Sequence, residues 1–202
     1  SIFGFQGRTN GYGGFYELGF MKTTRKTNIF RLDITEIKHQ KQEKLTLNGN
    51  IFGNPFFYGK INNFYQATIG FGQQHMVALS MVYSGGLALG LLKPYYVEVI
   101  DPADNQTKTI KYSQADSALF LGPTIIGGGG FGKGWSEMKI KPGAFVKTAL
   151  RFDYGRFNET VSGIEIGISA EFYGSKIQIL ANQKDRNLFF QGYIALLFGR
   201  RK

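Results

Sequence analysis

The chain contains no cysteine and only two histidines. The first absence excludes a disulfide framework, a cysteine zinc site and a thiol nucleophile, and the second argues against a histidine-rich metal site. Charged residues make up 19% of the 202 residues, which is below the usual share of about 25%. No stretch reaches the ~18 uninterrupted apolar residues of a membrane-spanning helix. The longest apolar stretch, from Met76 to Leu92, is broken by glycine and serine.

What the chain does contain is glycine and aromatic side chains. There are 28 glycines, and Phe, Tyr and Trp make up 15% of the residues. The apolar share of 43% is ordinary for a folded chain and argues against disorder. Ser1 opens the chain with no basic stretch and no apolar run behind it, as we expect of a product trimmed from a longer precursor. The length predicts a single domain, residues 1–202.

The dominant pattern is alternation with a period of two residues. Phe30, Leu32 and Ile34 form one face of a segment whose other face is Arg31 and Asp33. A period of two predicts β-strands rather than helices. Seven segments show it clearly, and Ser1 to Arg8 supplies a shorter eighth; the seven are 15–21, 29–38, 65–72, 77–91, 144–154, 163–172 and 190–198.

The residue types on the polar side of these strands distinguish a closed sheet from an open one. It mixes Gly, Ala, Ser, Thr and Gln with sparse charges of both signs, whereas a water-facing side collects Lys and Glu. Small residues with paired charges suit a narrow closed interior, and large apolar residues with aromatics near the strand ends suit lipid. We therefore expect an all-β fold: a closed antiparallel transmembrane β-barrel located in a bacterial outer membrane. A soluble barrel or sandwich is the alternative.

The connections between strands alternate in length. Residues 23–27, 73–75 and 155–158 read as short turns. Residues 39–62, 93–142 and 174–187 read as long extracellular loops. Outer-membrane barrels carry short turns on the periplasmic side and long loops outside. With both termini on the periplasmic side, this alternation predicts about eight strands.

Charged residues on the predicted inner face form a candidate lumen network. A barrel of eight strands has an interior filled by side chains, and buried charges need partners. We expect a plug of ion pairs with Arg31 and Arg151 as its hubs, because guanidinium suits bidentate pairing. The alternative is a path for ions or protons. The predicted members are Glu17, Arg31, Asp33, Lys147, Arg151, Asp153, Glu165 and Glu171.

The predicted loops are unusually apolar, and residues 93–112 read as a hairpin that projects beyond the membrane around a DPADNQ turn. Exposed apolar patches mark interaction sites. We expect these loops to contact a partner protein, with folding back over the barrel mouth as the alternative. The predicted partner-binding residues are Phe52, Phe56, Phe57, Tyr58, Leu119, Phe120, Ile125, Ile126, Phe131 and Trp135.

Signals for nucleotide or nucleic-acid binding are weak. Residues 127–134 (GGGGFGKG) have the spacing of a phosphate-binding loop but end in glycine where a magnesium-binding hydroxyl is needed. The net charge of +10 falls largely in turns and ends, as in Lys22, Arg25 and residues 38–44. We expect a solvated rim, which can also meet lipid phosphates or lipopolysaccharide. The sequence predicts neither a nucleotide nor a nucleic acid as a partner, and no cofactor.

No catalytic arrangement is apparent. His39 and His75 have no serine in a suggestive pattern beside them, although Glu36 and Glu43 flank His39. We name no catalytic residue, no metal ligand and no cofactor-binding residue, and we expect the protein not to be an enzyme.

Three stretches together resemble an uncharacterised group of small outer-membrane β-barrel proteins of Bacteroidota: residues 11–21, 82–96 and 132–159. The resemblance implies an outer-membrane location in such a bacterium. It also implies association with one of the large outer-membrane assemblies of these bacteria, such as type IX secretion translocons or nutrient importers. We therefore expect a non-enzymatic accessory or scaffold subunit of a larger outer-membrane complex, for example in protein secretion. The alternatives are a free-standing barrel that binds lipid or forms a small pore, and a lipid-modifying enzyme.

Overall fold

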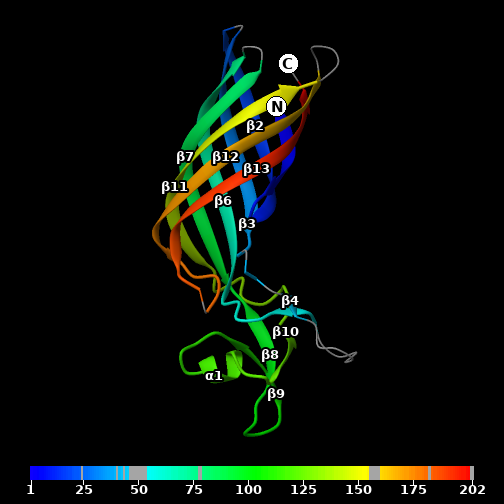
Figure 1. Ribbon diagram of the computed structural model, residues 1–202, viewed down its shortest axis with the longest axis vertical. Coiled ribbons are helices and arrows are strands. Elements are labelled where there is room, and N and C mark those ends of the chain that lie inside the picture. Colours follow the sequence, from blue (N-terminus) through cyan, green and yellow to red (C-terminus); the bar gives the residue numbers. More distant parts are fainter. Residues whose placement is uncertain are drawn as a thin grey trace.

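The protein folds into an all-β molecule built around one closed sheet. We describe it from a computed structural model, in which the described residues are 1–23, 25–39, 41–42, 44–45, 54–76, 79–154, 160–181 and 183–200. Eight antiparallel strands form a ring with the neighbour order β1-β13-β12-β11-β7-β6-β3-β2 (Figure 1). Their bounds are β1 Ile2–Arg8, β2 Gly11–Thr23, β3 Lys26–Ile37, β6 Asn62–Met76, β7 Ser80–Pro94, β11 Lys139–Asp153, β12 Thr160–Ile177 and β13 Arg186–Arg200.

The strand β1 closes the ring. It pairs with β13 from Ile2↔Gly199 to Arg8↔Tyr193 and with β2 from Ile2↔Glu17 to Arg8↔Gly11. The expectation that the first eight residues supply a strand is therefore confirmed, as is the number of eight. The ring leaves none of its strands with an unpaired edge.

The predicted alternation of faces is also confirmed. Along the middle of each strand of the ring, one parity points inward and is buried, and the other points outward and is more exposed. Glycine on the inner face makes room for large rings: a Cβ atom at Gly70 would lie 2.4 Å from the Phe145 ring. Small and large inward residues thus complement each other across the ring.

The connections of the ring differ at its two ends. Both termini lie at the end with the short turns, and the long connections leave from the opposite end (Figure 1). The long-connection end also holds one tight turn, Thr9–Asn10 between β1 and β2. The two predicted loops that follow β7 and β12 are shorter than expected, because those strands continue to Pro94 and Ile177. The predicted turn at 155–158 lies outside the described residues.

The predicted turn at 73–75 is wrong, because β6 continues to Met76 and pairs with Ser80 of β7. Polarity alone indicated a turn there. The polar side chains instead bond across strands: the Gln73 amide donates to Asn28 Oδ1 at 3.2 Å, and His75 Nε2 lies 2.8 Å from the Tyr83 hydroxyl.

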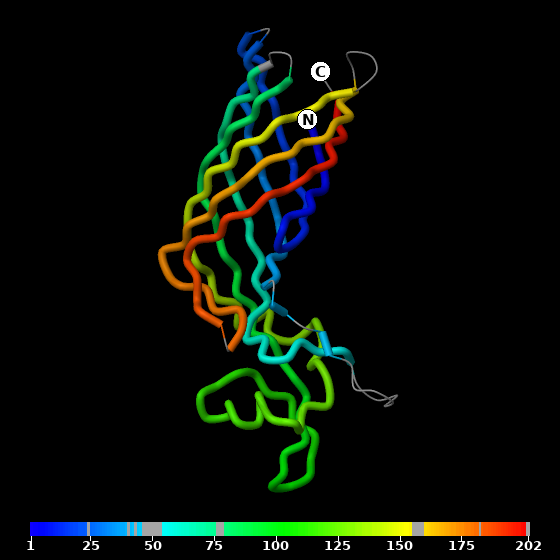
Figure 2. Tube along the Cα trace, in the orientation of Figure 1, coloured from blue at the N-terminus to red at the C-terminus, as the bar shows by residue number. Residues whose placement is uncertain are grey.

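The connection between β7 and β11 folds into a unit that we call the projection, residues 95–138. It contains β8 (Tyr96–Ile100), β9 (Thr107–Lys111), the short helix α1 (Ser117–Phe120) and β10 (Ile125–Gly128). The strands form a small sheet in the order β10-β8-β9, which confirms the predicted hairpin and adds a third strand. Figure 2 shows the projection extending beyond the ring, with residues 54–61 between the two. A short pair, β4 (Lys44–Leu45) and β5 (Phe56–Phe57), lies beside it.

Candidate functional site

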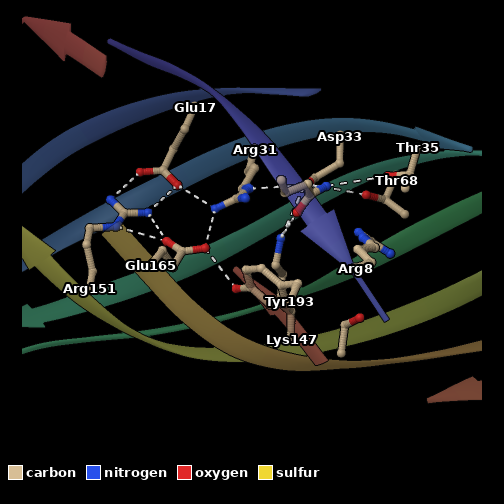
Figure 3. Close-up of polar contacts among 12 residues, drawn as sticks. Arg8, Glu17, Arg31, Asp33, Thr35, Thr68, Lys147, Arg151, Glu165 and Tyr193 are labelled. Carbon is tan, nitrogen blue, oxygen red and sulfur yellow. Dashed lines mark hydrogen bonds and ion pairs between the residues drawn. The ribbon is translucent and has the colours of Figure 1, made fainter. Parts of the chain in front are cut away.

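The centre of the lumen, meaning the interior of the ring, holds a pair of arginines between two glutamates. Arg151 of β11 donates to both carboxylate oxygens of Glu17 at 2.7 and 2.8 Å and to Glu165 at 2.6 and 2.9 Å. Arg31 of β3 donates to Glu165 at 2.8 Å and to Glu17 at 3.4 Å (Figure 3). Each of these four residues is at most 2% exposed. The two predicted hubs therefore share two carboxylates from opposite sides of the ring.

A second set of contacts extends the network toward the end with the long connections. Lys147 Nζ donates to Asp33 at 3.1 Å and to Gln6 at 3.2 Å, and the Gln6 amide donates to Asp33 at 2.9 Å. Arg31 Nε donates to Asp33 at 3.3 Å, which links this set to the arginine pair, and the Tyr193 hydroxyl donates to Glu165 at 2.8 Å (Figure 3). The carboxylates are thus satisfied by cations and by neutral donors together, as buried charges require.

Arg8 is a member of the network that sequence reasoning missed. Its Nη1 donates to Glu171 Oε1 at 3.0 Å, and Glu171 also accepts from Gln191 at 2.9 Å and from Ser169 at 2.8 Å. The signal was available, because Arg8 shares the parity of Gly4 and Gln6 on β1. The strand was too short for its parity to stand out.

The predicted member Asp153 does not belong to the buried network. It lies at the last position of β11 and is exposed, because the strand leaves the lumen there. With Arg8 included and Asp153 excluded, the buried charges of the network are balanced. The four cations are Arg8, Arg31, Lys147 and Arg151, and the four anions are Glu17, Asp33, Glu165 and Glu171.

Apolar side chains pack around the charged layer. One cluster, which includes Phe15, Val82 and Leu197, lies largely at the level of the charges, and Tyr193 belongs both to this cluster and to the network. Toward the long connections lies a larger cluster that includes Phe64, Phe145 and residues 179–180 of the connection after β12. The clustered side chains are at most 9% exposed. The described side chains of the lumen therefore pack closely, and the ion pairs join strands from opposite sides of the ring.

The projection has a small core of its own, and this corrects part of the predicted partner surface. Phe56, Phe120 and Ile125 are buried there with Val97 and Val99, so their side chains cannot contact a partner. The apolar side chains of these connections pack against one another instead of facing outward. Of the other predicted residues, Phe57, Leu119 and Ile126 are half-buried, Tyr58, Phe131 and Trp135 are exposed, and Phe52 lies outside the described residues.

The two histidines have no arrangement for nucleophilic catalysis within the described part of the chain. His39 Nδ1 accepts from the Lys41 backbone N–H at 3.2 Å, and burial together with nearby Arg186 and Lys41 lowers its pKa. His75, placed on β6 rather than in a turn, contacts Gln73 and Tyr83. No described serine or threonine hydroxyl bonds to either ring. The lysine of the GGGGFGKG stretch, Lys133, donates to Thr109 at 3.0 Å and so braces β9.

Among the described residues, no group of three or more acidic, histidine or cysteine side chains could hold a metal ion. No helix in the described ranges is long and apolar enough to cross a membrane. The fold is thus a closed eight-stranded antiparallel ring with a charged, filled lumen and a folded projection. Comparison of the chain with protein-family models, with curated proteins and with solved structures found no match.

Proposed function

We propose that the protein is a β-barrel that spans a bacterial outer membrane and acts, without catalysis, as an accessory or scaffold subunit of a larger membrane complex. One observation carries the membrane part of this proposal: large apolar side chains cover the outside of all eight strands and are exposed. Soluble monomers rarely expose a contiguous apolar patch above about a few hundred Å². The belt comprises Phe3, Phe5, Phe20, Leu32, Ile34, Ile69, Phe71, Met81, Leu87, Leu89, Val146, Leu150, Ile166, Ile168, Phe172, Phe190, Ile194, Leu196 and Phe198.

The hydrogen bonding of the backbone in the closed ring also supports the membrane part of the proposal. Lipid offers no hydrogen-bond partners, so a spanning sheet must close on itself. The ring satisfies this condition through the two pairings of β1.

The filled lumen and the folded projection support an accessory role rather than transport. The charges of the network are at most 9% exposed, and a large apolar cluster covers them toward the long connections, which argues against a water-filled path. The projection, in contrast, is an ordered unit held outside the ring with exposed Tyr58 beside it. A rigid, protruding unit is suited to protein contact. The partner that we propose is a large outer-membrane assembly, for which the resemblance to Bacteroidota proteins suggests the type IX secretion translocon.

The test is to remove the projection and leave the ring. Leu92 of β7 pairs with Lys139 of β11, so Asn-Gly in place of residues 95–138 closes a four-residue loop together with Lys93 and Pro94. We expect the shortened chain to insert into membranes and to lose a complex that the full chain forms in native membranes. Size and composition after extraction in mild detergent provide the measurement.

Two outcomes would count against the proposal. If the full chain from native membranes is always a single species of about the chain mass plus a micelle, the accessory role fails. If the untagged full chain is a soluble monomer without detergent, the membrane location fails as well.

A further inference from the structure

Three lysines gather at the rim of the ring where the projection begins. Lys38 follows β3, Lys93 lies near the end of β7, and Lys60 lies in the segment that crosses between the ring and the projection. Lys93 pairs with Asn63 of β6, and the next residue of β6, Phe64, pairs with Ile37 beside Lys38. The Tyr95 N–H donates to the Ile61 carbonyl at 2.8 Å, so the backbone at Lys60 also lies next to this rim. Glu36 lies on the same side of β3 as Lys38. Three cations and one carboxylate leave this rim cluster with a net charge of about +2.

In the part of the chain that the structure describes, Lys60 and Lys93 are both buried without an anionic partner, but Lys93 Nζ donates to the Phe131 carbonyl, whereas Lys60 has no acceptor. Lys60 is 3% exposed, and its Nζ lies over the rings of Phe57 at 4.7 Å and Tyr95 at 5.4 Å. Within the described residues, no carboxylate pairs with it and no oxygen accepts a hydrogen bond from its Nζ. Burial, opposed by the charge of Glu36 and assisted by Lys38 and Lys93, lowers the pKa of Lys60 to about 8. A buried, unpaired cation is costly, and such groups concentrate at functional sites.

Aromatic rings frame the rim cluster and connect it with the apolar belt. Lys38 Nζ lies 4.7 Å from the ring centre of Tyr12, and Lys93 Nζ lies 4.2 Å from that of Phe131 and 4.6 Å from that of Trp135. Trp135 stacks on Tyr65, which points outward from β6 next to the belt, with ring centres 6.0 Å apart. Tryptophan and tyrosine are enriched where a protein surface passes from hydrocarbon to water. In a ring that spans a membrane, a cluster framed in this way would lie at the level of lipid headgroups.

We propose that Lys38, Lys60 and Lys93 bind the phosphate monoester headgroup of an anionic lipid at the outer rim of the ring. A phosphate monoester carries a charge of about −1.5 to −2 at neutral pH, which matches the net charge of the rim cluster. Its oxygens would accept the hydrogen bonds that the buried Lys60 ammonium does not make within the protein. The acyl chains would lie on the belt below Tyr65. This inference rests on the membrane insertion proposed above.

The experiment measures lipid binding by the full chain in a phosphate-free maltoside detergent. Dihexanoyl phosphatidic acid, dihexanoyl phosphatidylcholine and inorganic phosphate are titrated separately and followed by phosphorus NMR. We expect saturable binding of the phosphatidic acid only. Lys60→Met should weaken that binding at least about tenfold, because a hydrogen bond to a charged group is lost. Lys60→Arg should retain most of it.

Lys108→Met is the matched control, because Lys108 lies on the projection and is already paired with Asp101 at 2.7 Å and Asp104 at 2.8 Å. It should bind the phosphatidic acid as the unchanged chain does. Equal binding by the Lys60→Met chain, or equal binding of phosphatidylcholine, would overturn the site. Inorganic phosphate bound as tightly as the lipid would overturn the lipid assignment. A chain that inserts into vesicles but fails these titrations refutes this inference alone, whereas a chain that does not insert refutes the proposed function.

Discussion

At the scale of the residue, charged side chains in the lumen pair with opposite charges from other strands of the narrow ring. The Arg151 guanidinium contacts Glu17 on β2 and Glu165 on β12, so one side chain ties strands from different parts of the ring. Such groups stabilise only as a complete set, because removing one partner leaves an uncompensated buried charge.

Arg151→Met should therefore destabilise the protein strongly. Breaking a buried ion pair by removing one partner costs about 3–5 kcal/mol, and the loss would appear as a lower urea midpoint for unfolding in vesicles. The double variant Glu17→Gln, Arg151→Met should recover part of the loss, since it removes one of the stranded carboxylates. A single variant as stable as the unchanged chain would show that the pair is not a structural tie.

Lys60 should make stability depend on pH in the opposite sense to a paired lysine. Its pKa is about 8 in the folded protein against 10.5 for an ordinary lysine. Between these values the unfolded chain holds the proton and the folded chain does not, so the free energy of unfolding rises with pH across this window. In phosphate-free detergent, Lys60→Met should be more stable than the unchanged chain at pH 7, and the difference should shrink as pH rises through 8 toward 10.5. Melting curves at pH 7 and 10 test this; a difference that does not change with pH would contradict it.

At the scale of the element, each strand of the ring has two chemically distinct sides. On β12, Ile166 and Ile168 are half exposed on the outside, while Glu165 and Ser169 are buried inside. The alternation was readable from the sequence because it follows from strand geometry, in which successive side chains point to opposite faces. The strand ends were less readable: Gln73 and His75 look like turn residues until their cross-strand partners Asn28 and Tyr83 are known.

The outward side gives a direct test of lipid contact. Ile168→Arg places a charge at the middle of β12, which should cost about 2–4 kcal/mol if that face lies at the bilayer midplane. The matched control, Ile100→Arg on the projection, replaces a side chain that is 36% exposed and should change stability little. Unfolding from vesicles measures both. If Ile168→Arg changes the stability no more than the control does, the belt does not face hydrocarbon.

At the scale of the whole molecule, the ring and the projection have separate cores. The core of the projection contains Val97, Val99 and Phe120, and the apolar layers of the lumen share none of these residues. The ring is thus complete without the projection, and the projection is a candidate for a contact that the ring alone cannot make.

The filled lumen predicts the behaviour of the whole molecule in a planar bilayer. The central charges are paired and buried, and an apolar cluster covers them toward the long connections, so the unchanged chain should insert without stepwise conductance. Arg151→Met should be equally silent, because it leaves that cluster intact. Stable single-channel steps from either chain would mean that the charged layer lines a path for ions.

The sequence by itself determined the parts that depend on local geometry: the all-β class, eight strands, the inward and outward parity, and most of the lumen charges. Only the tertiary structure decided which charges meet, since the contact of Arg8 with Glu171 joins residues 163 positions apart. It also decided that Phe56, Phe120 and Ile125 bury one another, and that Lys60 lies buried between two rings without an anion. The physical reason is that a pattern of period two records which side a residue faces, whereas pairing and burial depend on how distant strands are brought into register by ring closure.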